Sequence, residues 1–180
     1  GSGVAILNAG NLITGSTVIS NGVLGGTGSV AGTLTVQSGG TLAPGIPAVA
    51  VLMPEIGPFA AGATTIYGAM LMKINRSDVQ AGDKLIAPAI VVNAGSTLTV
   101  TSLGPTNFVA GDIFTLFSTP VSGAFSSINL PPLPGAGWVW TNKLGINGTR
   151  AVGAAVTVNP GSTNITASLS GGVISLSWPR

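Results

Sequence analysis

Acidic residues are the first place to look for chemistry in this chain, because it contains no histidine and no cysteine. Those two absences remove the commonest general base and the nucleophile arrangements that depend on it. A glycosidase needs two facing carboxylates, and a calcium site needs several clustered oxygen ligands. The sequence therefore predicts no catalytic site, no metal site and no cofactor, since its only acids are scattered: Glu55, Asp78, Asp83 and Asp112.

The spacing of these acids indicates structural roles. Asp78 and Asp83 lie close to Arg76 and Lys84 in the sequence, which predicts local ion pairs or turn capping. Asp83 and Asp112 each follow a glycine and precede a predicted strand, where an aspartate usually accepts hydrogen bonds from backbone N–H groups. An enzyme that acts on polysaccharide through these carboxylates is the least favoured alternative.

Three aromatic residues offer a second kind of chemistry, the stacking of sugar rings. Trp138 and Trp140 are two residues apart and share one face of a strand, and Tyr67 is a further candidate for glycan contact. A protein core or a subunit interface has the same requirement for aromatic side chains. We favour that second interpretation.

Charge is unusually sparse. Only 6% of the residues are charged, against about 25% in typical soluble domains. The basic residues are scattered, which excludes a nucleic-acid surface, and no apolar run reaches the roughly 18 residues of a membrane-spanning helix. Self-association is expected, because few charges oppose it. Asn-x-Ser/Thr sequons are expected by chance in this composition, and they begin at Asn75, Asn147 and Asn164.

Strands must position all of these residues. The 28 glycines and 12 prolines interrupt segments rich in Val, Ile and Thr, so the predicted fold class is all-β with essentially no helix. The most regular stretch is Ser20–Gly45. Leu34 and Val36 alternate there with Thr35 and Gln37, which places the two pairs on opposite faces of a strand, and glycines mark the corners.

Four segments follow from this pattern. Residues 1–45 are predicted to form the rungs of a short parallel β-solenoid, and residues 46–62 a connector rich in Pro and Gly. Residues 63–159 are predicted to form a β-rich body of further solenoid or sandwich-like strands. Residues 160–180 are predicted to form a terminal β-hairpin that can act as a donor strand.

Within the body, three local predictions can be compared with the structure. Thr64–Ile74 is apolar on both faces and is predicted to be one strand that is buried on both sides, or buried on one side and pressed against another subunit on the other. Lys84–Val92 and Ser96–Ser102 are predicted to pair with each other. Asn147-Gly148 is predicted to form a tight hairpin turn.

The stretch SNGVLGGTGSVAGTLTVQSGGTLAPG at residues 20–45 resembles the autotransporter-associated β-strand repeat of bacterial surface and secreted proteins. Later stretches resemble the region that follows such repeats. They are DKLIAPAIVVNAGSTLTV at 83–100, AGDIFTLFS at 110–118, SGAFSSINLPPLPGAGWVW at 122–140 and INGT at 146–149. The resemblance implies a right-handed parallel β-solenoid, a bacterial cell-surface or extracellular location, and no catalytic residues.

The chain contains about one such repeat, whereas related proteins often carry many. We therefore expect a non-enzymatic structural subunit that polymerises into a filament or sheath by strand addition between copies of itself. A surface adhesin that binds cell-surface glycans is the alternative. The residues predicted to mediate self-assembly are Ile66, Met70, Met72, Ile165, Leu169, Ile174, Leu176 and Trp178.

Overall fold

The structure is a computed structural model, and it describes residues 3–11, 13–48, 53–104, 107–155 and 166–177. The fold is all-β, as predicted, and the only helix of the described residues is α1 (Leu144–Asn147). The strands are β1 (Val4–Ile6), β2 (Gly10–Asn11), β3 (Thr17–Gly26), β4 (Ser29–Val30), β5 (Leu34–Pro44), β6 (Pro58–Ala61), β7 (Thr64–Ile66), β8 (Ala69–Ile74), β9 (Lys84–Ile86), β10 (Ile90–Val92), β11 (Thr97–Ser102), β12 (Ile113–Thr115), β13 (Val121–Gly123), β14 (Ser127–Asn129), β15 (Trp138–Lys143), β16 (Thr149–Ala154), β17 (Thr166–Ser170) and β18 (Val173–Ser177).

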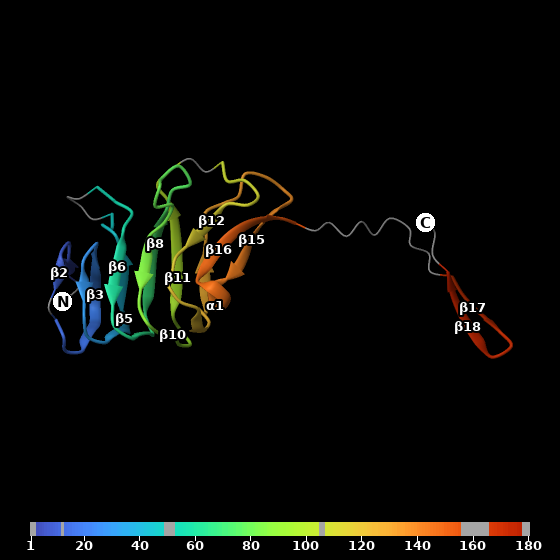
Figure 1. Ribbon diagram of the computed structural model, residues 1–180, viewed down its shortest axis with the longest axis horizontal. Helices are drawn as coiled ribbons and strands as arrows, with labels where there is room; N and C mark the ends of the chain where they lie inside the picture. The colour runs from blue at the N-terminus through green and yellow to red at the C-terminus, as the bar shows by residue number, and fades with distance from the viewer. Residues whose placement is uncertain (1–2, 12, 49–52, 105–106, 156–165, 178–180) are drawn as a thin grey trace.

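Parallel pairing arranges most of the described strands into three ladders. The first ladder contains β3, β5, β7, β10 and β13 in that order. The second contains β1, β3, β5, β8, β11 and β14, and the third contains β2, β4, β6 and β9. The chain therefore visits the ladders repeatedly in the same order, and Figure 1 shows the strands side by side along the body.

The core consists of side chains stacked in register between the ladders. In the first ladder Ile19, Val36, Ile66 and Val92 occupy equivalent positions, and all four are buried. In the second ladder Leu24, Leu42, Met70 and Leu98 do the same. Parallel neighbours lie about 4.8 Å apart, so each apolar side chain packs directly on the equivalent one of the next strand.

The alternation predicted within β5 is confirmed. Leu34 and Val36 are completely buried, whereas Thr35 is half-buried and Gln37 is exposed. Because side chains alternate with period two, the hydroxyl side of this strand faces outward. The local sequence therefore determines which face of the strand joins the core.

Thr64–Ile74 is not the single strand that the sequence predicts. It breaks at Tyr67 and Gly68 into β7 and β8, which belong to different ladders. Only one side of β8 faces the core, because Met70 and Met72 are buried while Leu71 is exposed. Because the chain turns at this point, one continuous segment contributes a strand to each of the two ladders.

Gly68 is required at this corner because two backbone oxygens approach it. A Cβ added there would collide with the carbonyl oxygens of Gln37 and Gly40. Gly68→Ala is therefore expected to lower the free energy of unfolding by about 1–3 kcal/mol, measured by urea denaturation. Gly15→Ala is the matched control, because its added Cβ meets nothing within 4 Å. Equal stability of the two variants would contradict this account of the corner.

Two further predictions about pairing are wrong. β9 and β10, which cover the predicted strand Lys84–Val92, do not pair with β11; each pairs in parallel with strands from other segments. The predicted turn at Asn147-Gly148 is instead the end of helix α1, where Gly148 adopts a left-handed conformation with φ of 74°. β15 and β16 still form an antiparallel hairpin in which Lys143 pairs with Thr149, but α1 and Gly148 connect the two strands in place of a tight turn.

Part of the predicted connector is itself a strand. Pro58–Ala61 forms β6 of the third ladder, and Phe59 is completely buried there against Leu85 of β9 in register. Pro58 is tolerated because it is the first residue of the strand, a place where a missing N–H does least harm. The prolines of 46–62 therefore delimit a strand as well as a loop.

An antiparallel sheet lies beyond the last parallel strands. Its order is β12–β16–β15, and α1 contacts β13 of the first ladder. Figure 1 shows α1, β15 and β16 at the end of the body opposite to β1. Buried Phe108 and Phe114 pack here against the ring of Trp140, with ring centroids 5.3 and 5.9 Å from it.

Candidate functional site

The hairpin of β17 and β18 has two chemically distinct faces. Its antiparallel register pairs Ala167 with Leu176 and Leu169 with Ile174. Directly opposed residues share a face, and so do residues two apart; these four apolar side chains therefore form one face. The other face carries serines opposite one another, as at Ser168 and Ser175. We call the first set, Ala167, Leu169, Ile174 and Leu176, the apolar hairpin face.

This apolar hairpin face is uncovered. The exposed fractions of Leu169, Ile174 and Leu176 are 72%, 70% and 57%, and each described residue from Ala167 to Ser177 whose exposure is given is exposed. Two strands without a partner are marginally stable in water. An uncovered apolar face on such a hairpin is typical of a surface that another sheet covers.

The residues predicted to mediate self-assembly separate into three groups. Leu169, Ile174 and Leu176 lie together on the apolar hairpin face. Ile165 and Trp178 lie outside the described residues. Ile66, Met70 and Met72 are buried in the core, so the predicted contact with a neighbouring subunit has no exposed side chain at these three positions.

The three aromatic residues predicted for glycan contact occupy different environments. Trp140 donates a hydrogen bond from Nε1 to the Pro131 carbonyl oxygen at 2.9 Å, and its ring packs on the core. Trp138 is half-buried and also packs on the core. Tyr67 is 44% exposed and lines an open hollow of about 450 Å³ beside Gln37.

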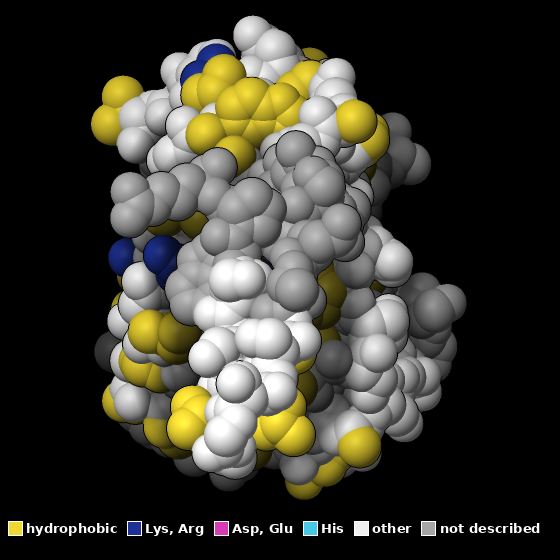
Figure 2. All heavy atoms as spheres, turned by 90° about the vertical axis from the view of Figure 1, so that its right-hand side faces the viewer, with side chains coloured by type: hydrophobic (Ala, Val, Ile, Leu, Met, Phe, Trp, Pro, Cys, Tyr) yellow, Lys and Arg dark blue, Asp and Glu magenta, His cyan; other side chains and the backbone are white. Residues whose placement is uncertain are grey.

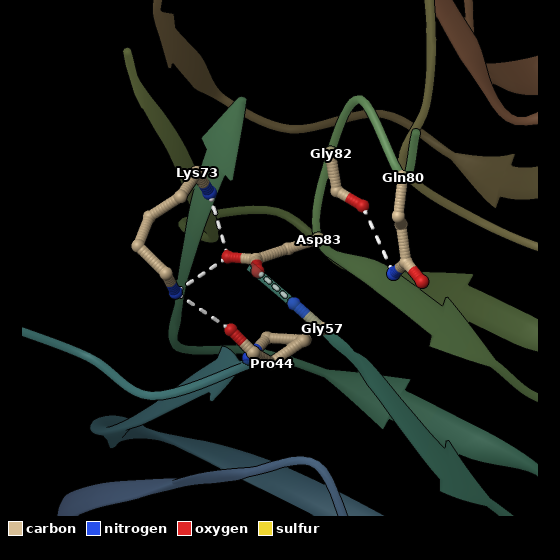
Figure 3. Close-up of polar contacts among 6 residues, drawn as sticks. All are labelled: Pro44, Gly57, Lys73, Gln80, Gly82 and Asp83. Atoms are coloured by element: carbon tan, nitrogen blue, oxygen red, sulfur yellow. Dashed lines mark hydrogen bonds and ion pairs between the residues drawn. The ribbon is translucent and has the colours of Figure 1, made fainter. Parts of the chain in front are cut away.

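A buried ion pair is the most developed polar arrangement of the described residues. Lys73 Nζ lies 2.6 Å from Asp83 Oδ2, and the side chains are 7% and 0% exposed. Figure 3 shows the Asp83 carboxylate between Lys73 and Gly57, whose backbone N–H groups donate to it at 2.7 and 3.0 Å. Lys73 Nζ also donates to the Pro44 carbonyl oxygen at 2.8 Å. The ion pair thus links β8 to the end of β5, through Lys73, and to the residue before β6, through Asp83.

Burial of this carboxyl group controls its titration. Desolvation raises the pKa of Asp83 from an ordinary 3.8 to about 6, although the Lys73 charge and the hydrogen bonds lower it. The folded chain therefore binds this proton at a higher pH than the unfolded chain does.

The expected pH dependence follows from that difference. The stability contributed by Asp83 is fully present below pH 3.8 and is lost as the pH rises through 6, a change of roughly 3 kcal/mol. Urea denaturation between pH 4 and pH 8 measures it. Asp83→Asn removes the titrating group, so the wild type should gain stability relative to this variant on acidification. A wild type that loses stability relative to Asp83→Asn at pH 4 would contradict the raised pKa.

The other ion pair is also formed between distant segments. Arg76 Nε lies 3.0 Å from Asp112 Oδ2, and the Val109 N–H donates to the same oxygen at 2.9 Å. The predicted role of Asp83 and Asp112 as acceptors of backbone N–H groups is confirmed. The predicted ion pairing of Asp78 and Asp83 with Arg76 and Lys84 is wrong, because Asp83 pairs with Lys73 and Arg76 pairs with Asp112.

The remaining acids do not extend either pair into a reactive site. Glu55 and Asp78 are both exposed. Within the described residues, no three His, Cys, Asp or Glu side chains come together in a group able to hold a metal ion. The carboxylates therefore support stability more clearly than chemistry.

Arg150 of β16 is a buried cation that sequence analysis did not single out. It is 7% exposed, it forms no ion pair with any described residue, and its Nε has no hydrogen-bond partner there. Burial lowers the pKa of its guanidinium. No signal in the sequence marks it, because residues 149–154 read as an ordinary strand in which Arg150 could equally face solvent.

Arg150→Met is expected to raise the free energy of unfolding by about 1–3 kcal/mol. An apolar side chain of similar length avoids the desolvation of an unpaired charge. Thermal and urea denaturation measure the change. Arg76→Met is the control, since it removes a partly exposed, paired cation and should lower stability by about 1 kcal/mol or less. A destabilised Arg150→Met would show that the guanidinium has a stabilising partner.

The described part of the chain contains no helix with the length and hydropathy that crossing a bilayer requires. No protein-family model matches the chain, and comparisons with curated proteins and with solved structures give no match.

Proposed function

We propose that this chain is a non-enzymatic structural subunit that assembles with copies of itself into a filament or sheath outside the bacterial cell. The observation that carries the proposal is the uncovered apolar hairpin face, where three large side chains are more than half exposed. A subunit that presents such a surface to another copy gains stability by covering it. When the hairpin of one copy contacts a different surface of the next copy, the contact is head-to-tail. Head-to-tail contacts that do not close into a ring generate fibres.

The parallel ladders support a short β-solenoid as the body of this subunit. Equivalent positions stack in register in all three ladders, and the chain passes through the ladders in a repeated order. Each repeat of a solenoid contacts only the repeats on either side of it along one axis, so such folds extend into long structures. The resemblance of residues 20–45 to a repeat of bacterial surface proteins supports the same architecture and location.

The surface composition also favours assembly. Only ten of 180 residues carry a charge, and three of these, Lys73, Asp83 and Arg150, are buried and so not available at the surface. Figure 2 shows one face on which yellow hydrophobic side chains lie among white polar ones and dark-blue basic side chains are sparse. Little electrostatic repulsion therefore opposes the contact of two copies.

Deletion of residues 160–180 tests the proposal. The full chain should form large particles in sedimentation velocity, whereas the deletion variant should sediment as a single small species. The variant's body should stay folded, because the core residues of the ladders lie before residue 155. Large particles of unchanged size from the deletion variant would sink the proposed role of the hairpin.

A further inference from the structure

A hollow lies on the outer face of β8 and β11. Its volume is about 180 Å³, and its lining is mainly apolar. Leu71 of β8 and Leu103, just after β11, line it together with Ala43 of β5 and with Pro47 and Pro54 from the segment after β5. Leu71 and Leu103 are 38% and 40% exposed, so they remain accessible to a partner.

The hollow presents almost no charge. Its one charged lining residue is Lys73, whose ammonium group is held by Asp83 Oδ2 and by the Pro44 carbonyl oxygen. Figure 3 shows the Lys73 side chain directed at these two acceptors. An incoming apolar side chain would therefore not have to compete with a free cation. Hydroxyl groups of Thr99 and Thr101 supply the polar part of the lining.

The apolar hairpin face has the matching chemistry. Residues 166–177 contain no charged side chain, and Leu169, Ile174 and Leu176 project from one side of the hairpin. A hollow of about 180 Å³ has room for one or two aliphatic side chains of this size. The serines of the opposite face would stay in water, so docking would not bury their hydroxyl groups without a partner.

We propose that the hollow over β8 and β11 receives the apolar hairpin face of a second copy of the chain. This inference rests on the proposed self-assembly and names its receiving surface. A second copy is the occupant because the hairpin face remains exposed within its own chain. The hairpin face is small beside the roughly 800 Å² per partner of a stable interface, so one contact is weak and assembly depends on concentration.

Cysteine cross-linking tests this contact cleanly, because the chain contains no native cysteine. One variant carries Leu71→Cys in the hollow and a second carries Leu176→Cys on the hairpin. A disulfide between them needs Cα atoms within about 7 Å. Mixing the two variants under mild oxidation should give a covalent dimer on a non-reducing gel. Ser175→Cys, on the opposite face of the same hairpin, is the matched control and should give at least tenfold less dimer.

The outcomes separate this inference from the proposed function. Equal dimer yields from Leu176→Cys and Ser175→Cys, in samples whose light scattering shows assembly, would overturn the docking site and leave self-assembly standing. Absence of assembly in the unmodified chain at any concentration would overturn both. A Leu71→Cys and Leu176→Cys double variant that closes its disulfide within one chain would overturn the second copy as occupant. Leu103→Cys provides another acceptor position if Leu71→Cys fails to fold.

Discussion

Asp83→Ala is expected to lower the free energy of unfolding by about 3–5 kcal/mol, the range found when one partner of a buried ion pair is removed. The substitution leaves the buried Lys73 ammonium group without the carboxyl oxygen to which it donates, an acceptor that protonation of Asp83 retains. It also removes the acceptor of two backbone N–H groups, those of Gly57 and Lys73. The three donors, which belong to the two residues Gly57 and Lys73, thus lose the group that holds them together.

Urea denaturation of the purified chain measures this loss. Asp112→Ala is the matched control, since its partner Arg76 is 28% exposed and can return to water; its loss should be about 1 kcal/mol. The double variant Lys73→Met with Asp83→Asn should be more stable than Asp83→Ala, because it contains no unpaired charge and keeps an acceptor for Gly57. Equal losses for Asp83→Ala and Asp112→Ala would refute the structural role of the buried pair.

Replacing Leu169, Ile174 and Leu176 with serine is expected to raise the concentration needed for assembly by at least tenfold. Each substitution removes apolar area whose burial is worth about 1.5–3 kcal/mol when complete, and 1.4 kcal/mol corresponds to a tenfold change in an equilibrium constant. Static light scattering over a dilution series measures the threshold.

The control for this experiment changes three residues on the opposite hairpin face. Ser168→Ala, Ser170→Ala and Ser175→Ala alter the same two strands without removing apolar area from the docking face. This variant should assemble at the wild-type concentration. If both triple variants assemble equally well, the apolar hairpin face does not mediate the contact.

Several features of the fold follow directly from local sequence. The alternation around Leu34 and Val36 predicts the inward face of β5, and the serines around Gly171-Gly172 predict an amphipathic hairpin. Both depend on residues adjacent along the chain, where the period of a strand fixes the side-chain direction. The absence of long helices follows in the same way from the frequency of glycine and proline.

The buried ion pair could not be predicted in this way. Strand alternation places Lys73 on the outer face with Leu71, and its burial results from the segments that follow β5 in the chain. Asp83 reaches it because the chain reverses direction between β8 and β9, where Ile74 and Gly82 form an antiparallel bridge and the Asp83 N–H donates to the Lys73 carbonyl oxygen. Which residues of β8 meet which residues before β9 depends on the length and path of the loop between them, and no residue pattern within either strand specifies it.

The sequence predicts a subunit contact at Ile66, Met70 and Met72 for a related reason. An unbroken strand with apolar residues on both faces needs a covering surface on each face. The corner at Gly68 divides this segment into two strands, and the core covers only one face of β8. The self-assembly residues on the hairpin, Leu169, Ile174 and Leu176, can be predicted without knowing where a corner lies. Their exposure follows from the lack of any described strand beside β17 or β18.

Negative-stain electron microscopy of the purified chain, imaged at several concentrations, tests self-assembly most directly. The proposed function predicts long fibres or sheets of uniform width that shorten or disappear on dilution. Isolated particles of monomer size at every concentration would contradict it.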